Sequence, residues 1–396
     1  MKLKTLVCLS LITLVAPLVP VHAQANCSGS ATSALTNWVD YRFDHCHTGF
    51  NPFERILSPA NVGNLVPFRE YNFGAEIPAY SAPPVLVNGV VYVAANETLY
   101  AIKAATGVVL WSFKAAVDGY GITSPTVVNG IAYVAAPNPS ILYALNAQTG
   151  VPLWTYPYVA AEGGPPTVAG GLVYFSTGEA MLALNATTGA LVWQWQQDDY
   201  RQIYTSASIA DGAVYFGIHE DGLYDDVIAL DAGSGQLLWN HRESNFNVDE
   251  NAVAVSDGLV FFMSRLTMYV LDAHTGAIVW TSVLQDQADN PLATANGVVY
   301  VGGFYAVYAF DEHTGSMVWK HSTGSDPAYD SIIVANGVLY VATQSNVYAL
   351  NASTGDLLWE HDDAVDTRGS SPLVVNGVLY VATASNGWIY SFHLPQ

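Results

Sequence analysis

The stretch Ala144-Leu145-Asn146-Ala147-Gln148-Thr149-Gly150-Val151-Pro152-Leu153-Trp154 decides the fold, because versions of it recur along most of the chain. The shared pattern is a small residue, then Asp or Asn in most copies, then Thr-Gly or Ser-Gly, and a tryptophan four residues after the glycine. An Asp or Asn side chain before such a glycine can close a turn onto the backbone. Seven copies are present, and their tryptophans are Trp111, Trp154, Trp193, Trp239, Trp280, Trp319 and Trp359.

A second signal is a hairpin pair that ends in glycine, about 16 residues before each copy. Asn-Gly, Asp-Gly and Gly-Gly pairs accept the positive φ angles of two-residue hairpins. Eight such pairs occur, at spacings of 41, 41, 41, 46, 39, 40 and 40 residues. Their glycines are Gly89, Gly130, Gly171, Gly212, Gly258, Gly297, Gly337 and Gly377. In the first copy the pattern predicts strands over about 83–88, 90–95, 98–103 and 108–114.

Four short strands per 40-residue repeat are typical of a β-propeller blade. We therefore expect an all-β chain whose residues 65–396 form an eight-bladed propeller of four-stranded antiparallel blades. The eighth repeat ends at Gln396 with three strands, without Thr-Gly or Trp. Tyr71-Asn72-Phe73 precedes Trp111-Ser112-Phe113 by 40 residues and resembles it. Residues 65–74 are therefore predicted to supply the outer strand of blade 8 and remove an exposed sheet edge.

The composition excludes several classes of protein. The chain has 396 residues, of which 51% are apolar and only 11% charged, so it is neither disordered nor a coiled coil. Its 33 acidic and 12 basic residues give a formal net charge of −21. Contacts to phosphate need clustered Lys and Arg, so no nucleic-acid partner is expected.

The first residues have the pattern of an export signal. Lys2 and Lys4 precede an almost unbroken apolar run from Leu6 to Val21, and small residues follow at the spacing that signal peptidase needs. The alternative is a membrane anchor, but the run is short and no basic flank follows it. We expect residues 1–25 to be a signal peptide, residues 26–64 a lead-in segment, and the chain to be a periplasmic or secreted bacterial protein without a membrane span.

Two cysteines remain after removal of the signal. An even pair in an exported chain is typical of a disulfide, so Cys27 and Cys46 are predicted to be bonded. Asp44-His45-Cys46-His47 could instead suggest a metal site, but a lone cluster of this kind is a weak signal, and Cys27 offers Cys46 a partner.

The repeated motif resembles the tryptophan-docking repeat of quinoprotein β-propellers, which are proteins with pyrroloquinoline quinone (PQQ)-like repeats. The resemblance covers about residues 65–393. It implies that each of the seven tryptophans packs between neighbouring blades, which agrees with the ordinary core role of a Trp at a fixed strand position. Some members of the family are PQQ-dependent alcohol or sugar dehydrogenases with calcium at the cofactor, and others are binding or assembly scaffolds.

Most features of the enzymes are missing. The sequence has no vicinal Cys-Cys pair, no Cys-x-x-Cys-His haem motif and no Asp-x-Asp-x-Asp-Gly calcium loop. About 320 residues are used for minimal blades, which leaves little chain for a substrate pocket. Catalytic and cofactor-binding residues therefore cannot be assigned from the sequence.

Acidic residues gather on one face of the predicted ring. The connections between blades and the loops between second and third strands lie on one side of the ring, which we name the loop face. The Asn-Gly and Thr-Gly turns lie on the other side, which we name the hairpin face. By position, 21 of the 33 acids fall on the loop face, opposed by Arg201, Arg242, Arg265 and Arg368. Loops carry charge in most proteins. The functional alternative is a negative funnel that attracts cations or a basic protein or polymer.

The fourth repeat has the longest spacing because of an insertion in this face. Glu220, Asp221, Asp225 and Asp226 place four carboxylates within seven residues, a set that could hold calcium through oxygen ligands. A solvated loop is the plainer interpretation.

Two functional hypotheses follow. The first is an exported, non-catalytic propeller, expected to be a monomer, that binds a protein, polymer or envelope component at its acidic face. The alternative is a small PQQ- and calcium-dependent alcohol or sugar dehydrogenase, in which an Asp of the loop face would be the general base.

Overall fold

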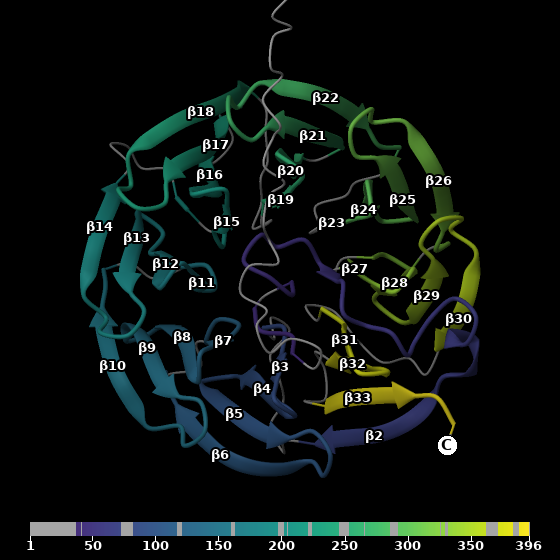
Figure 1. Ribbon diagram of the computed structural model, residues 1–396, viewed down its shortest axis with the longest axis horizontal. Coiled ribbons are helices and arrows are strands. Elements are labelled where there is room, and N and C mark those ends of the chain that lie inside the picture. Colours follow the sequence, from purple (N-terminus) through teal and green to yellow (C-terminus); the bar gives the residue numbers. More distant parts are fainter. Residues whose placement is uncertain are drawn as a thin grey trace, which may run out of the picture.

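The chain forms a closed ring of eight radial sheets (Figure 1). The structure is a computed structural model. It describes residues 37–40, 42–72, 82–116, 121–159, 163–196, 202–203, 205–220, 224–244, 253–264, 266–285, 292–324, 326–328, 332–361, 371–382 and 388–395. The predicted all-β, eight-bladed architecture with four-stranded antiparallel blades is confirmed.

Each blade runs from an inner three- or four-residue strand to an outer strand on the rim. Blades 1 and 2 are β3 Val85–Val87, β4 Val90–Ala95, β5 Thr98–Lys103, β6 Val108–Lys114, and β7 Thr126–Val128, β8 Ile131–Pro137, β9 Ser140–Asn146, β10 Pro152–Pro157. Blades 3 and 4 are β11 Thr167–Ala169, β12 Leu172–Ser176, β13 Ala180–Asn185, β14 Leu191–Gln196, and β15 Ser208–Ala210, β16 Ala213–Glu220, β17 Tyr224–Asp231, β18 Leu237–Ser244.

The second half repeats the pattern. Blades 5 and 6 are β19 Ala254–Ser256, β20 Leu259–Ser264, β21 Thr267–Asp272, β22 Ile278–Val283, and β23 Ala293–Ala295, β24 Val298–Gly302, β25 Ala306–Asp311, β26 Met317–Ser322. Blade 7 is β27 Ile332–Ala335, β28 Val338–Ala342, β29 Val347–Asn351, β30 Leu357–His361, and blade 8 is β31 Leu373–Val375, β32 Val378–Ala382, β33 Trp388–His393 with β2 Val66–Asn72.

The predicted ring closure is confirmed, because β2 lies antiparallel to β33 on the rim of blade 8. Figure 1 shows these two strands, purple and yellow, side by side although they lie at opposite ends of the chain. The alignment of Tyr71 with Trp111 is wrong by two residues. Trp111 is opposite Ala101, and at the same place in blade 8 Arg69 is opposite Ser391. The Thr-Gly turn that fixes this register in the other blades is absent here, so spacing alone does not predict it.

Contacts between blades explain the repeated motif. The Trp111 Nε1 atom donates a hydrogen bond of 3.0 Å to the carbonyl oxygen of Ala147 in the next blade, and the same oxygen accepts one from the Tyr92 hydroxyl. The indole ring lies against Gly150. The same arrangement joins six tryptophans to six glycines: Trp111 and Gly150, Trp154 and Gly189, Trp193 and Gly235, Trp239 and Gly276, Trp280 and Gly315, Trp319 and Gly355. Trp359 donates to the Leu65 carbonyl instead.

The described residues contain very little helix. The 3-10 helix η2, Val62–Asn64, ends the lead-in segment just before β2, and the two-residue strand β1, Phe50–Asn51, precedes it. Within the part of the chain that is described, no helix is long and apolar enough to cross a membrane.

Candidate functional site

The axis of the ring holds part of the lead-in segment. We name residues 37–51 the axial segment. It begins at the hairpin face, where the Asn37 Oδ1 atom accepts a 2.8 Å hydrogen bond from the backbone N–H of Asn88. Trp38 and Leu86 then exchange two backbone hydrogen bonds, of 2.6 and 2.9 Å. The chain therefore enters the ring beside the inner strand of blade 1.

Backbone carbonyls of the axial segment pair with the inner strands one blade after another. An inner strand has a free edge toward the axis, and a buried N–H on that edge needs an acceptor. The central residue of six inner strands donates its N–H to a carbonyl of the axial segment at 2.6–3.0 Å. The pairs are Leu86 to Trp38, Val127 to Val39, Ile209 to His45, Val255 to Cys46, Thr294 to Thr48 and Val334 to Gly49.

The remaining two blades are reached by side chains. The Asn51 amide donates a 2.7 Å hydrogen bond to the carbonyl of Val374 in blade 8. In blade 3 the Thr167 hydroxyl lies 3.4 Å from Nε2 of His47. The axial segment thus contacts the inner strand of every blade, and in Figure 1 this purple stretch lies inside the ring.

The chain returns to the hairpin face after β1, beyond the end of the axial segment. The buried carboxylate of Glu54 accepts the N–H of Gly377 in the blade 8 hairpin at 3.0 Å, and Asn336 of the blade 7 hairpin donates to the Leu57 carbonyl at 2.7 Å. The lead-in segment therefore contacts the hairpin face at Asn37 and again at Glu54 and Leu57, beyond the axial segment.

Polar side chains of the axial segment form a buried cluster against blades 2 to 4. His47 is fully buried, and its Nδ1 atom lies 3.0 Å from the Ser208 hydroxyl and 3.5 Å from the Ser206 hydroxyl. Burial holds the pKa of His47 well below its ordinary value, and the nearby Arg42 charge lowers it further. The imidazole is therefore neutral at pH 7.

Two acidic side chains of the cluster, buried Asp40 and half-buried Asp44, also have partners within the chain. The Asp40 carboxylate accepts a 2.8 Å hydrogen bond from the Thr126 hydroxyl. Burial raises the pKa of Asp44, whose carboxylate accepts N–H groups from Cys46 and Thr48 and the Thr48 hydroxyl. These partners are supplied by the chain itself, so the cluster fastens the axial segment in the ring.

The described axial residues do not fit PQQ at the level of the inner strands. PQQ is a planar polycarboxylate, and its seat needs open space and cationic groups that can turn toward it. Arg42 is fully buried, and its Nη2 atom would stand 3.4 Å from a Cβ at Gly49. Such a Cβ would also meet the Ile332 carbonyl at 3.0 Å.

The blade 4 insertion is described in part. Asp226 lies in β17, is only 1% exposed, and its carboxylate forms two 2.9 Å hydrogen bonds with the Arg242 guanidinium. Asn240 donates a third at 3.0 Å. The side chains of Glu220, Asp221 and Asp225 lie outside the described part. Asp226 is therefore held by protein donors, whereas the calcium hypothesis for the other three carboxylates stays untested.

Two other acids of the loop face, Glu97 and Asp326, also have protein partners. Glu97 pairs with Lys114 at 2.7 Å, and Asp326 accepts the N–H of Ser345 at 2.9 Å. Within the described ranges no three His, Cys, Asp or Glu side chains stand close enough to hold a metal. Most inter-blade connections of this face lie outside those ranges.

The predicted disulfide also stays a prediction. Cys46 is fully buried, and its Sγ atom lies 3.1 Å from the carbonyl oxygen of Ile209. Cys27 lies outside the described residues.

Sequence reasoning missed the axial role of Asp40, Arg42 and His47. The available signal was their grouping: three ionisable side chains within eight residues of a segment that has no repeat. The hydroxyl partners of Asp40 and His47, Thr126 and Ser208, lie 86 and 161 positions further along the chain.

This fold and this motif define a propeller of PQQ-like repeats. The family model described as "Outer membrane protein assembly factor BamB" matches residues 71–194, 140–245 and 223–390, so the chain belongs to this PQQ-like repeat family. No curated protein matches the sequence.

Solved structures share the fold at low identity. A quinohaemoprotein alcohol dehydrogenase from Comamonas testosteroni superposes with a TM-score of 0.78 and 16% identity over 92% of this chain and 82% of that chain. A europium-containing methanol dehydrogenase gives 0.78 and 14% over 93% and 100%. BamB from Moraxella catarrhalis gives 0.60 and 19% over 83% and 97%. At these identities the likeness shows the fold alone.

Proposed function

We propose that this chain is an exported, non-catalytic binding or scaffold module for a protein, polymer or envelope component. One observation carries the proposal: the axial segment takes up the centre of the ring and pairs with the inner strand of six blades through backbone carbonyls. With its centre used for structure, the ring offers its faces and rim for binding. The fold that the chain shares with BamB from Moraxella catarrhalis is consistent with such a role.

A PQQ- and calcium-dependent dehydrogenase is the alternative, supported by the two dehydrogenase structures that share the fold. The discriminating experiment is a titration of the purified protein with PQQ and calcium, followed by the quinone absorbance and by calorimetry. We expect no saturable PQQ binding. Stoichiometric binding of PQQ together with dye reduction by an alcohol or sugar would contradict the proposed function.

Export and the disulfide belong to the same proposal. We infer that residues 1–25 are removed and that Cys27 and Cys46 form a disulfide that ties the start of the lead-in segment to the ring. Closure of a loop of this length stabilises a protein by about 3 kcal/mol at most. Intact mass and non-reduced peptide mapping of the exported protein check both points, and two free thiols would contradict the disulfide.

A further inference from the structure

Asn-Gly is the commonest hairpin tip of the propeller, and its five copies have the same backbone shape. The asparagine φ is 46–56° and the glycine φ is 74–80° in all of them. The five pairs are Asn88-Gly89, Asn129-Gly130, Asn296-Gly297, Asn336-Gly337 and Asn376-Gly377. Because residue pair and backbone are shared, differences in their chemistry come from what surrounds each hairpin.

An Asn-Gly pair has a reaction of its own. The backbone nitrogen of the glycine attacks Cγ of the asparagine, and no Cβ on the glycine hinders the approach. The new C–N bond closes a succinimide ring, and the proton of the backbone nitrogen passes through solvent to the side-chain nitrogen, which leaves as ammonia. Water then opens the ring at either carbonyl and gives aspartate or isoaspartate, without any oxidant or reductant. The reaction needs an amide group that can turn and a glycine N–H that can lose its proton.

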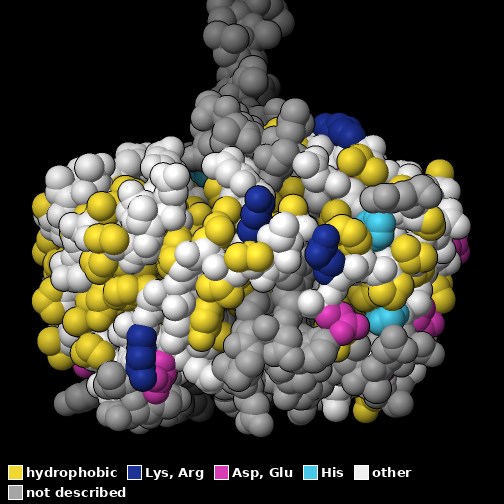
Figure 2. Space-filling model, turned by 90° about the horizontal axis from the view of Figure 1, so that it is seen from below, with side chains coloured by type: hydrophobic (Ala, Val, Ile, Leu, Met, Phe, Trp, Pro, Cys, Tyr) yellow, Lys and Arg dark blue, Asp and Glu magenta, His cyan; other side chains and the backbone are white. Residues whose placement is uncertain are grey.

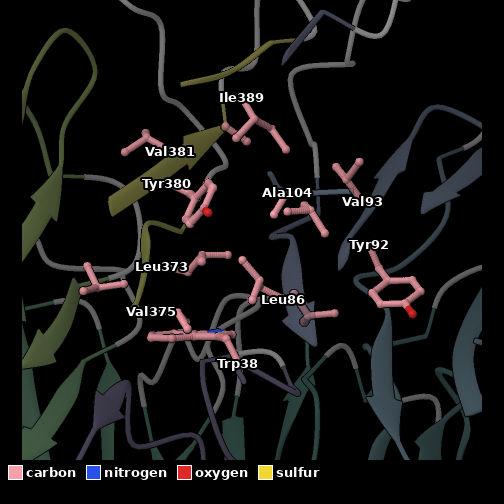
Figure 3. Close-up of a cluster of buried hydrophobic side chains, with 14 of the residues drawn as sticks. Trp38, Leu86, Tyr92, Val93, Ala104, Leu373, Val375, Tyr380, Val381 and Ile389 are labelled. Atoms are coloured by element: carbon pink, nitrogen blue, oxygen red, sulfur yellow. The ribbon is translucent and has the colours of Figure 1, made fainter. Parts of the chain in front are cut away.

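The blade 8 hairpin does not meet the second of these needs. The Gly377 N–H donates a 3.0 Å hydrogen bond to Oε2 of Glu54, and a negative charge beside an N–H opposes the loss of its proton. Gly377 is buried, and a Cβ there would meet Cγ2 of Ile56 at 2.7 Å. Figure 3 shows Val375, which lies just before this hairpin, beside Trp38 in the core. The hairpin is therefore held by the core on one side and by the lead-in segment on the other.

The blade 7 hairpin does not meet the first need. The Asn336 amide donates a 2.7 Å hydrogen bond from Nδ2 to the Leu57 carbonyl. The ring of Pro59 lies over the glycine, because a Cβ at Gly337 would meet its Cγ at 3.5 Å. An amide group held in this way cannot turn toward the Gly337 nitrogen unless the hydrogen bond breaks.

The hairpins of blades 2 and 6 are uncovered. Asn129 and Asn296 are exposed, and a Cβ at Gly130 or Gly297 would meet nothing within 4 Å in the described part of the chain. The 2.9 Å hydrogen bond from the Ala147 N–H that fastens the blade 2 turn ends on the Gly130 carbonyl, which is not the atom that attacks. Both needs of the reaction are therefore met at these two hairpins.

The hairpins of blades 6 and 7 form a matched pair. Residues 295–298 and 335–338 both read Ala-Asn-Gly-Val, and in both the alanine ends the inner strand of its blade. Among the described residues, the lead-in segment covers the blade 7 hairpin and leaves the blade 6 hairpin open. A difference in rate between them therefore reports the cover and not the local sequence.

We propose that Asn129 and Asn296 are spontaneous modification sites, and that the lead-in segment shields Asn336 and Asn376 from the same reaction. This inference does not depend on the proposed function. Each conversion replaces a neutral amide by a carboxylate, and isoaspartate also lengthens the backbone of a two-residue turn. Figure 2 shows that acidic side chains are sparse on the described surface of one wall of the ring, so a new carboxylate changes the local charge.

The test is ageing of the purified mature protein in mildly alkaline buffer, below its melting temperature. Digests taken at intervals are mapped by mass spectrometry, and isoaspartate is detected with an isoaspartyl methyltransferase. Asn129 and Asn296 should convert about tenfold faster, or more, than Asn336 and Asn376, because a hydrogen bond must first break at the shielded sites. Asn88 should fall between the two groups, because its own backbone N–H is held although the residue is exposed.

Glu54→Gln provides the matched protein variant for blade 8. Oε2 of Glu54 accepts the Gly377 N–H, and Oε1 already accepts three other N–H groups, from Arg55, Ile56 and Leu57. Glutamine has one side-chain oxygen, so the variant should release Gly377 and speed the conversion of Asn376 about tenfold. Asn336 should keep its rate. Glu70→Gln, which changes an exposed carboxylate of β2, should alter neither site.

Equal rates at Asn296 and Asn336 in the folded protein overturn the proposal, and so does slower conversion of Asn129 than of Asn376. Ageing in concentrated urea should bring the matched pair to one rate, since the cover is then lost. A difference that persists in urea would have a cause other than the fold and would also overturn it. If Glu54→Gln does not fold, the rates of the wild type with and without urea still decide.

Discussion

The Trp111 ring lies so close to Gly150 of the next blade that a Cβ atom at Gly150 would stand 2.6 Å from ring atom Cε3. Glycine is therefore required at this position for space, in addition to its positive φ of +72°. The Thr-Gly to Trp pattern thus describes one contact between neighbouring blades, whose two halves come from successive repeats.

Gly150→Ala should destabilise the fold more than Gly130→Ala. Both glycines have positive φ, +72° and +77°, but a Cβ at Gly130 meets nothing within 4 Å. Backbone strain costs about 1–2 kcal/mol at either position, and displacement of Trp111 should cost roughly 1–3 kcal/mol more. Urea unfolding of the two variants measures the difference. Equal losses would show that the close packing of Trp111 contributes nothing.

The sequence predicted the blades well because their signals are local. The Asn88-Gly89 type of hairpin needs positive φ at both residues, which the structure has at +52° and +74°. The register of β2 was predicted wrongly because Arg69 and Ser391, which pair in blade 8, are far apart in the sequence and meet only in the folded ring. The axial segment has no repeat, and the grouping of Asp40, Arg42 and His47 does not by itself place it on the axis of the ring. Its contacts use the carbonyls of residues such as Val39 and Gly49, and every residue type has such a carbonyl.

The second prediction concerns His47 and acid. Because its pKa is held well below the ordinary value, the unfolded chain takes up a proton below about pH 6.5 and the folded chain does not. His47 therefore reduces stability as the pH falls through that value. His47→Gln cannot titrate, so its loss of unfolding free energy relative to wild type should shrink by about 1 kcal/mol between pH 6.5 and 5.5.

Chemical denaturation at three pH values, 7.5, 6.5 and 5.5, checks this. Ser208→Ala removes a neighbour of the ring at 3.0 Å but no titrating group, and it serves as the control. A difference between His47→Gln and wild type that stays constant with pH would contradict a buried, neutral imidazole.

The third prediction concerns Glu312 and base. Glu312 is 1% exposed and lies at the turn position that is alanine in most other blades, such as Ala147 in blade 2. Its Oε1 and Oε2 atoms have no hydrogen-bond donor within the described residues. Burial, with Asp257 and Asp311 beside it, raises its pKa to about 8. Between the ordinary carboxyl value and pH 8 the folded chain keeps a proton that the unfolded chain loses. Stability conferred by this proton is therefore lost as the pH rises toward 8.

Glu312→Gln should remove most of this dependence and raise the melting temperature most strongly at pH 8, by the equivalent of roughly 3 kcal/mol or more. His313, whose Nδ1 atom lies 3.5 Å from Glu312 Oε1, should be kept in all variants. Glu70→Gln changes an exposed carboxylate of β2 and is the control. Parallel melting curves of wild type and Glu312→Gln from pH 5 to pH 8 would contradict the raised pKa.

The last prediction separates calcium binding from the Asp226–Arg242 ion pair. Asp226 is buried, whereas the Arg242 side chain is 50% exposed, so the loss of this pair leaves a cation that water can still reach. Asp226→Asn should therefore cost about 1–3 kcal/mol of unfolding free energy whether or not calcium is present.

If the insertion binds calcium, the double variant Asp221→Asn, Asp225→Asn should instead lose the increase in melting temperature that calcium gives the wild type. A ligand that binds only the folded state stabilises it by mass action. The measurement is a melt in millimolar calcium chloride against sodium chloride at equal ionic strength, since diffuse screening follows ionic strength and not the identity of the metal. Equal shifts in the two salts would exclude a calcium site in blade 4 and leave Asp226 a structural residue.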